Sequence, residues 1–459
     1  MRTFYTVSIL SFGIICFRTS LFAQGPDTLW TRKYDYQLID WANKVLETTD
    51  HGYLLVGQTC TYGNNAYLII KTDHSGYPLW SKIYEWIVGS YWEEAWGAVE
   101  TPDGGYIIVG SSEYIPMMMK LDANGDSVWS KPLPFSAKDI QKTLDGNYII
   151  TGGAGAYLWL AKISETGDTI WTKKYGGNGT YTGYQVRACS DGGYIIGGAL
   201  YSGGTSRNLI KTNANGDTLW TKDLGSNEYT AVRPTPDGGY IATAYYNLDA
   251  HIVKTDASGN ILWSVTYGGG ETDVAYSVDE THDGCYVAFG ETGSFGAGGY
   301  DAFIVKVKPD GNIIWTKTYG DAGHDEGWYG ICTSDSGYII TGCYSPNGLS
   351  GDVFLIKTVP DITGVAERQN LLKDKGLLSL FINPVVNGEI DFTYNLLRNK
   401  EIKISLYNSL GQEAKLLFKG VTTPGNHRIR ERLDIPAGIY FLKLAAGRDC
   451  VIKKLVVVK

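Results

Sequence analysis

The stretch DGGYIIVG, residues 103–110, indicates a repeat architecture because it recurs in varied form at six other places. In every copy an Asp opens a tight turn, and a Tyr three residues later begins an apolar run rich in β-branched residues. Glycine in the turn adopts the positive φ angles that other residues resist. The Tyr and the apolar run fit a buried β-strand. The copies begin at Asp50, Asp103, Asp145, Asp191, Asp237, Asp283 and Asp335.

A second pattern accompanies the first: a Lys is followed nine residues later by a Trp, with a Gly at a constant position between them. This constancy predicts a β-hairpin held in one register. Each unit therefore has four predicted strands. One precedes the Asp turn, one follows it, one ends in the repeated Lys, and one carries the Trp. The pairs are Lys71 and Trp80, Lys120 and Trp129, Lys162 and Trp171, Lys211 and Trp220, Lys254 and Trp263, and Lys306 and Trp315.

The spacing of the units and the two ends of the array predict a closed ring. Successive Asp turns lie 42 to 53 residues apart, and four strands at this period are typical of β-propeller blades. The seventh unit reaches Lys357 but lacks a Trp strand, whereas an orphan Trp strand around Trp30 precedes the first unit. Such a strand can complete the last blade and remove exposed strand edges. We therefore predict an all-β chain in which residues 24–361 form a seven-bladed β-propeller closed by an N-terminal strand.

The first 23 residues read as a secretory signal peptide. Arg2 supplies the basic start, Val7 to Phe17 the apolar core, and Ala23 ends a plausible cleavage site. The apolar run is shorter than the roughly 20 residues of a transmembrane helix. We therefore expect no transmembrane segment and a secreted or outer-surface protein that is exported through the periplasm.

Charge and cysteine usage narrow the partners further. The net charge of −8 argues against nucleic acid as a partner, because a phosphate backbone is bound by basic patches. The cysteines follow no repeat position and form no Cys-x-x-Cys pair. Scattered buried thiols are therefore expected rather than a disulfide framework.

The composition changes after Pro360. A charged linker is expected over residues 362–380, and short alternating strands separated by turn residues fill residues 381–459. Several strands in fewer than a hundred residues predict a small immunoglobulin-like β-sandwich.

Two resemblances follow from these residues. The Asp-turn and Trp-strand units resemble repeats common in exported β-propellers of Bacteroidetes-like bacteria. The last 80 or so residues resemble the C-terminal sorting domain of type IX secretion substrates, which implies that the type IX secretion machinery reads this domain as an export and attachment signal. An ordinary sandwich with a binding role is the alternative. The residues that carry the second resemblance are Asn383, Pro384, Gly411, Gly438, Tyr440, Lys453 and Lys454.

The candidate ligand site is the segment before the second Asp turn, Tyr84 to Trp96, where the repeat is least regular. Its rings could form an aromatic platform that stacks on sugars or anchors a protein partner; alternatively, they fill gaps between blades. Related rings are expected just before the first strand of other blades, at Trp41, Tyr184, Tyr276 and Trp328. The ligand-binding candidates are Trp86, Tyr91, Trp92, Trp96, Trp41 and Trp328.

Carboxylates give two candidates for calcium, which takes oxygen ligands. Asp40, Glu94, Asp273 and Asp325 all precede their Asp turns by nine or ten residues, and they could instead accept hydrogen bonds from backbone amides. Residues 122–126 echo a calcium loop but lack the Glu expected further on. The histidines lack zinc-site spacing, and no phosphate loop or nucleophile elbow occurs. We therefore predict no metal, no cofactor and no catalytic residue.

The repeated residues themselves are expected to be structural. A Trp at one offset in every unit should pack between adjacent sheets, and the repeated Lys should either end its strand exposed or pair within its blade. The chain is thus predicted to be an exported binding protein for a glycan or a protein. A propeller-type glycan hydrolase or lyase, and a structural envelope protein, are the alternatives.

Overall fold

The computed structural model describes residues 25–36, 39–61, 64–86, 92–177, 179–202, 205–206, 209–225, 231–346, 351–361, 378–382, 389–396, 399–408, 412–436, 438–446 and 449–457. Regular structure in these ranges consists of β-strands. No helix with the length and hydrophobicity needed to cross a membrane occurs in them.

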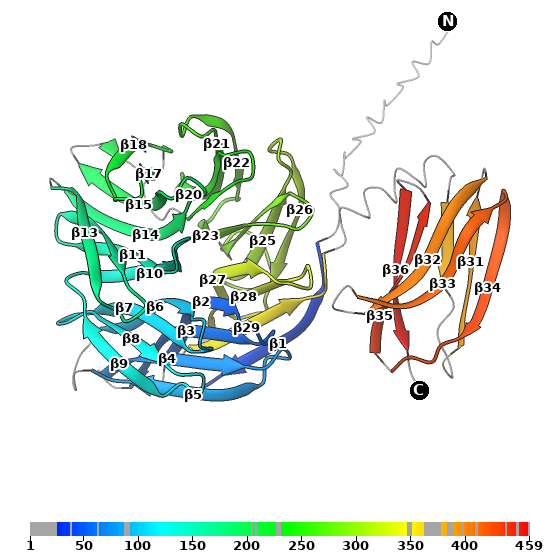
Figure 1. Ribbon diagram of the computed structural model, residues 1–459, viewed down its shortest axis with the longest axis horizontal. Helices are drawn as coiled ribbons and strands as arrows, with labels where there is room; N and C mark the ends of the chain where they lie inside the picture. The colour runs from blue at the N-terminus through cyan, green and yellow to red at the C-terminus, as the bar shows by residue number, and fades with distance from the viewer. Residues whose placement is uncertain are drawn as a thin grey trace, which may run out of the picture.

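Seven antiparallel sheets follow one another between residues 28 and 358 of the described chain (Figure 1). The first three contain β2 (Ile39–Glu47), β3 (Tyr53–Thr61), β4 (Asn64–Thr72) and β5 (Pro78–Tyr84); β6 (Glu93–Glu100), β7 (Tyr106–Ser112), β8 (Met117–Leu121) and β9 (Ser127–Pro132); and β10 (Ser136–Lys142), β11 (Tyr148–Ala154), β12 (Tyr157–Ile163) and β13 (Thr169–Gly176).

The next three contain β14 (Thr180–Ala188), β15 (Tyr194–Ser202), the short β16 (Thr205–Ser206), β17 (Leu209–Thr212) and β18 (Thr218–Lys222); β19 (Val232–Pro234), β20 (Tyr240–Tyr246), β21 (Asp249–Thr255) and β22 (Ile261–Tyr267); and β23 (Asp273–Glu280), β24 (Tyr286–Thr292), β25 (Asp301–Val307) and β26 (Ile313–Tyr319). The last contains β27 (His324–Cys332), β28 (Tyr338–Ser345), β29 (Asp352–Thr358) and β1 (Thr28–Tyr34). This succession of radially repeated, mostly four-stranded sheets is a β-propeller repeat fold.

The N-terminal strand β1 occupies the fourth position of the last sheet. It pairs antiparallel with β29, and Trp30 lies opposite Lys357. In the preceding sheets the repeated Trp lies opposite the repeated Lys in the same way, as Trp263 does opposite Lys254. The orphan Trp strand therefore supplies the partner that the seventh unit lacks.

Every repeated Lys forms an ion pair with the Asp of the turn in its own sheet. The Nζ–carboxylate distances are 2.6–2.9 Å, and the Lys side chains are buried or nearly so. Of the two roles expected for this Lys, pairing within the blade is the one observed. The pairs are Lys71–Asp50, Lys120–Asp103, Lys162–Asp145, Lys211–Asp191, Lys254–Asp237, Lys306–Asp283 and Lys357–Asp335.

The repeated Trp packs against the neighbouring sheet, as expected. The ring of Trp80 lies over Gly125 in the next hairpin turn, where an added Cβ would come within 2.8 Å of the ring. At the ends of the array Trp315 covers Gly25 and Trp30 covers Gly76, so the same contact recurs where the two ends of the array meet. Trp315 is fully buried, whereas the other six repeated Trp residues are half-buried.

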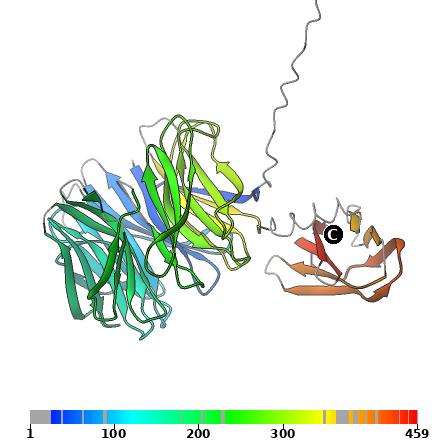
Figure 2. The same ribbon diagram turned by 90° about the horizontal axis from the view of Figure 1, so that it is seen from above.

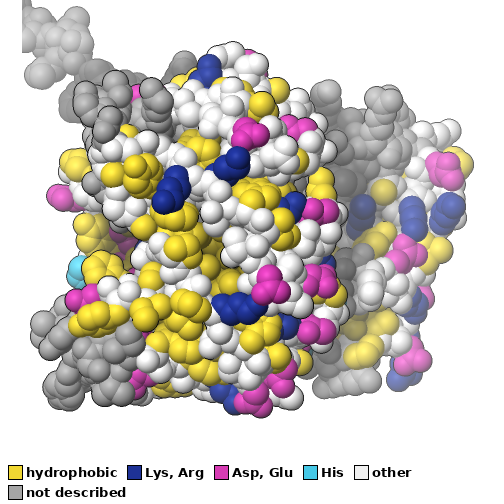
Figure 3. All heavy atoms as spheres, turned by 60° about the vertical axis from the view of Figure 1, so that its left-hand side comes forward, with side chains coloured by type: hydrophobic (Ala, Val, Ile, Leu, Met, Phe, Trp, Pro, Cys, Tyr) yellow, Lys and Arg dark blue, Asp and Glu magenta, His cyan; other side chains and the backbone are white. Residues whose placement is uncertain are grey.

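Surface ion pairs also join adjacent sheets. Lys82 pairs with Asp126 at 2.7 Å and Lys173 with Asp217 at 2.8 Å, each across a sheet boundary. Figure 3 shows basic and acidic side chains side by side among apolar ones on one side of the molecule. Such exposed pairs contribute little stability individually, and the buried apolar side chains between sheets form the core.

The C-terminal part contains two antiparallel sheets (Figure 2). One has β30 (Leu378–Ile382), β31 (Glu389–Leu396) and β34 (Gly425–Arg432); the other has β33 (Glu413–Thr422), β32 (Lys400–Asn408), β35 (Gly438–Ala446) and β36 (Asp449–Val457). Buried residues from both sheets, such as Phe392 and Leu442, share one core. Strand β30 begins inside the segment expected as linker.

The residues that carry the sorting-domain resemblance are described in part. Gly438 opens β35, and the buried Tyr440 donates a hydrogen bond to the Pro436 carbonyl at 3.0 Å. Lys453 and Lys454 lie on β36, opposite Leu442 and Phe441. Asn383, Pro384 and Gly411 lie outside the described residues.

Candidate functional site

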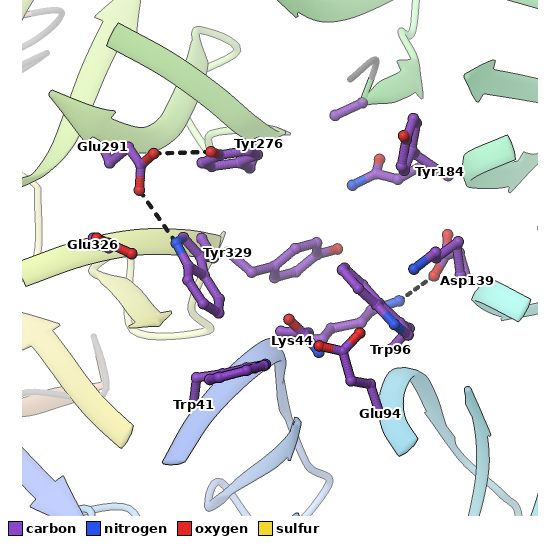
Figure 4. A pocket seen from close by; sticks show the side chains of 15 residues that line it. Trp41, Lys44, Glu94, Trp96, Asp139, Tyr184, Tyr276, Glu291, Glu326 and Tyr329 are labelled. Carbon is purple, nitrogen blue, oxygen red and sulfur yellow. Dashed lines mark hydrogen bonds and ion pairs between the residues drawn. The ribbon is translucent and has the colours of Figure 1, made fainter. Parts of the chain in front are cut away.

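The sheets converge on a central cavity of about 320 Å³ (Figure 4). Six first strands (β2, β6, β10, β14, β23 and β27) contribute side chains to its wall, and Ala231, just before β19, and Glu291, on the second strand β24, complete it. Because each sheet presents its first strand to the cavity, residues far apart in the sequence meet there. Its volume lies at the lower end of the range for ligand pockets.

A β-bulge in the first strand directs one side chain of each contributing sheet into the cavity. The strand register shifts after a small residue, as between Ala95 and Gly97, and the residue inside the shift points into the cavity. Bulges commonly redirect side chains at binding sites. The six bulged residues are Asn43, Trp96, Lys138, Tyr184, Tyr276 and Trp328.

This arrangement corrects one expectation. The rings of Tyr184, Tyr276 and Trp328 lie inside first strands rather than just before them, and Trp41 likewise belongs to β2. A signal for the bulge is present in the sequence: the bulged residue always follows Ala or Gly, at positions 42, 95, 137, 183, 275 and 327. Lys138 and Asn43 share that signal, although sequence reasoning did not select them.

The aromatic wall of the cavity is ordered by edge contacts and hydrogen bonds. Trp41 and Trp328 meet edge to face with their ring centroids 5.8 Å apart. The Trp328 indole N–H donates to Glu291 at 3.2 Å, and the Tyr276 hydroxyl donates to the other oxygen of Glu291 at 2.9 Å. Across the cavity, the Lys138 ammonium lies 3.3 Å from the ring centroid of Trp96.

A charged layer of Lys44, Asp139, Arg187 and Tyr329 joins four sheets. Asp139 pairs with Lys44 from β2 and with Arg187 from β14, the latter at 2.6 Å. Arg187 also donates to the Tyr329 hydroxyl of β27 at 3.2 Å. Burial alone would raise the pKa of Asp139, but the two cations lower it below its ordinary value. The layer therefore holds an ionised carboxylate among its charged partners.

The other carboxylates of the cavity have raised pKa values. Burial and the neighbouring Glu326 raise the pKa of Glu291 to about 7, even though two donors stabilise its charged form. Burial also raises the pKa of Glu326 and of Glu94, the latter opposed by Lys138. The Lys138 pKa falls to about 8 because of burial. The cavity thus contains groups that exchange protons near neutral pH.

The residues expected to form the ligand platform fall into three groups. Trp41, Trp96 and Trp328 line the central cavity. Trp92 is 58% exposed and lines a neighbouring pocket that shares Lys138 with the central cavity. Trp86 is half-buried, and its ring stacks 6.3 Å from that of Tyr84. Tyr91 lies outside the described residues.

The carboxylates considered for calcium have other partners. Asp40, Asp273 and Asp325 each accept a backbone N–H, at 2.6, 3.0 and 2.8 Å respectively. Their equivalent in the second unit is Glu93, which accepts the Trp86 N–H at 3.0 Å, whereas Glu94 faces the cavity. No group of three His, Cys, Asp or Glu side chains suited to a metal occurs among the described residues. The backbone-amide alternative is thus observed for the three Asp residues, whereas Glu94 accepts the Trp92 indole N–H.

The remaining small motifs are structural. Asp122 closes its turn by accepting the backbone N–H groups of Asn124 and Asp126, both at 2.9 Å. The five described cysteines of the ring are free thiols, as expected. They are Cys60, Cys189, Cys285, Cys332 and Cys343.

Part of the chain is similar to one protein family. A family model described as outer membrane protein assembly factor BamB matches residues 158–331, from β12 to β27. No curated protein sequence matches the chain.

Several solved structures are similar to the chain at low identity. A streptogramin B lyase is 13% identical over 71% of this chain and 97% of its own, with a TM-score of 0.47. A catalytically inactive variant of virginiamycin B lyase from Staphylococcus aureus is 11% identical over 73% and 99%, with a TM-score of 0.46. A protein of unknown function from Bacteroides caccae is 15% identical over 50% and 82%, with a TM-score of 0.36. These likenesses are too distant to assign an activity.

Proposed function

We propose that this chain is an exported carbohydrate-binding protein whose ligand enters the central cavity. The observation that carries the proposal is the set of six aromatic side chains around one cavity of ligand size. Aromatic faces stack on sugar rings. The N–H and O–H groups of these rings, together with the nearby carboxylates, can form hydrogen bonds with sugar hydroxyls. The rings are those of Trp41, Trp96, Tyr184, Tyr276, Trp328 and Tyr329.

The neighbouring pocket provides room for a longer glycan. Lys138 lines both pockets, and the exposed Trp92 of the second pocket donates a hydrogen bond to Glu94 of the first at 3.0 Å. A sugar unit in the central cavity could therefore continue toward Trp92. Trp86 packs against Tyr84 and Tyr67 instead, which makes Trp92 the stronger ligand candidate of the two.

Export is the second part of the proposal. Residues 1–23 would act as a signal peptide, and residues 381–459 as an immunoglobulin-like sorting domain that is read by the type IX secretion machinery. The resemblance in the C-terminal residues supports this role. The ring itself would be a seven-bladed propeller, an interpretation supported by seven successive sheets in the described chain and by the pairing of β1 with β29. The protein would then be secreted or held at the outer surface.

A glycan array tests the carbohydrate ligand directly. The secreted chain should bind a defined set of glycans, and Trp92→Ala should weaken binding of longer glycans while the shortest bound glycan keeps its affinity. Absence of binding to any glycan on a broad array would reject the proposal and favour a protein ligand or a structural role.

Catalysis is the second candidate. Glu291 keeps a proton to near pH 7 and neighbours Glu326, whose pKa is also raised by burial, and a pair of carboxyl groups can act as acid and base on a glycan. Incubation with each glycan that binds should then release new reducing ends or unsaturated sugars, and Glu291→Gln should abolish the release. If the bound glycans are recovered intact, the protein is a binder.

A further inference from the structure

The two sides of the central cavity differ in charge balance. On one side Asp139 contacts Lys44 and Arg187, and Glu94 lies within electrostatic reach of Lys138. On the other side β24 contributes Glu291 and β27 contributes Glu326. Figure 4 shows these two carboxylates across the cavity from the pair of Lys44 and Asp139.

The side with Glu291 has only neutral hydrogen-bond donors. Glu291 accepts from the Tyr276 hydroxyl and the Trp328 indole. Among the described residues no Lys or Arg forms an ion pair with Glu291 or Glu326. His324, on the same strand as Glu326, favours the charged form of that carboxylate, and the nearby thiol of Cys343 has its pKa raised by burial. Two half-buried carboxylates without a strong cation repel each other.

Aromatic rings border the same two carboxylates. Trp328 and Tyr276 contact Glu291 through their hydrogen bonds, and Trp41 stands edge to face against Trp328. A cation gains from the faces of Trp and Tyr rings and forms strong, charge-assisted hydrogen bonds with carboxylates. The aromatic cavity favours a compact organic ligand. Glu291 and Glu326, which form no ion pair with a Lys or Arg of the described residues, favour a ligand with a positive charge.

We propose that the bound glycan carries a free amine, whose ammonium group lies between Glu291, Glu326 and the rings of Trp41 and Trp328. This inference rests on the proposed carbohydrate function and specifies the class of sugar. An ammonium group supplies the charge that this side lacks. An N-acetyl group in its place is neutral and bulkier, and a hydroxyl supplies hydrogen bonds without charge.

Three disaccharides with one backbone isolate the effect of charge. Chitobiose carries amines, diacetylchitobiose carries acetamides, and cellobiose carries hydroxyls at the same positions. Titration calorimetry on the full secreted chain should give chitobiose an affinity at least about tenfold higher than the other two. Equal affinities, or a preference for either neutral sugar, would overturn the inference and leave carbohydrate binding standing. Absence of binding by all three would also overturn the inference. The glycan array tests separately whether the protein binds carbohydrate. A lysine-rich peptide that binds in their place would point to a protein ligand.

Variants assign the preference to this side of the cavity. Glu291→Gln and Glu326→Gln should each reduce chitobiose affinity by about tenfold and change cellobiose affinity little. Glu165→Gln, in an exposed turn, is the matched control and should leave all three affinities unchanged. If Glu291→Gln and Glu326→Gln both keep the preference for the amine, the site is elsewhere.

A ligand whose charge does not change with pH separates the titration of the protein's carboxylates from that of the ligand's amines. Trimethylated chitobiose should bind more tightly at about pH 8 than at about pH 6, because Glu291 loses its proton in that interval. Near pH 7 its binding should release a proton, detected as a dependence of the heat on the buffer, and Glu291→Gln should remove this release. Affinity that is flat with pH, together with no proton release, would contradict the role given to Glu291.

Discussion

At the scale of single residues, Glu291 couples the stability of the fold to pH. Its pKa in the folded chain is about 7, above the ordinary 4.5 of the unfolded chain, so the folded state holds the proton more tightly. Stability contributed by the protonated form is therefore complete below about pH 4.5 and declines as the pH rises to about 7.

Glu291→Gln should remove this decline. We expect the variant to exceed the wild-type chain in free energy of unfolding by about 2 kcal/mol at pH 8 and to differ little at pH 4. Urea unfolding at the two pH values measures the difference, with Glu165→Gln as control. A constant difference across pH would mean that Glu291 has the same pKa in the folded and unfolded chains, against the raised value.

The buried Lys of each sheet gives a second residue-scale prediction. Lys254 is 2% exposed at its side chain and pairs with the more exposed Asp237 at 2.8 Å. Burial opposes ionisation of Asp237, but hydrogen bonds from Lys254 and Thr235 lower its pKa to about 2. The stabilisation is thus present above the unfolded pKa of Asp and is lost as the pH falls toward 2.

Asp237→Asn should cost about 1–2 kcal/mol of unfolding free energy at pH 7, because the buried ammonium loses its carboxylate. The cost should disappear near pH 2. Asp217→Asn, which breaks the exposed pair with Lys173, should cost less stability than Asp237→Asn, because solvent screens the exposed pair. Equal costs at pH 7 would show that burial of the Lys does not matter.

At the scale of elements, two glycines in one sheet separate backbone strain from packing between sheets. Gly238 and Gly259 both have positive φ, +82° and +75°. A Cβ at Gly238 would meet nothing within 4 Å, whereas one at Gly259 would lie 2.8 Å from the Trp220 ring of the preceding sheet.

Gly238→Ala should therefore cost about 1 kcal/mol from backbone strain alone. Gly259→Ala should cost a further 1–3 kcal/mol or so, since the ring of Trp220 must shift. Chemical denaturation of the two variants gives the comparison. Identical losses would mean that the Trp contact contributes nothing to the junction between sheets.

The elements also show how far the sequence predicts this molecule. The Asp turn, the Tyr strand and the Lys–Trp hairpin repeat with little change, so the strands and their register follow from local propensity and spacing. Trp96 is a ligand candidate from the sequence because its segment departs from the repeat, and Trp41 and Trp328 are candidates because they occupy nearby positions in other units.

The composition of the cavity was harder to predict. Which side chains meet there depends on a bulge in each first strand and on sheets remote in the sequence. Glu291 comes from β24, a second strand, and joins the cavity through Trp328 of the next sheet. Lys44, Asp139 and Arg187 are unremarkable in the sequence and form one layer only after the sheets come together. Contacts between non-adjacent sheets leave no local signal.

At the scale of the whole molecule, β1 joins the ends of the array. It pairs with β29, Trp30 covers Gly76 of the first sheet, and Trp315 of the sixth covers Gly25. Deleting residues 1–36 would leave β29 with an exposed edge. We expect that chain to lose cooperative thermal unfolding or to associate through the edge, while a chain lacking only residues 1–24 keeps cooperative unfolding. Equal melting of the two truncated chains would show that β1 is dispensable.

Calorimetric titration of the tightest-bound array glycan into Trp328→Ala tests whether the ligand binds in the aromatic cavity. Trp328 touches both Trp41 and Glu291, so its loss should weaken binding by about 1–3 kcal/mol, at least roughly fivefold. Tyr77→Ala, an exposed ring in a hairpin turn that lines neither pocket, should leave the affinity unchanged. Wild-type affinity in a folded Trp328→Ala protein would contradict ligand binding in the central cavity.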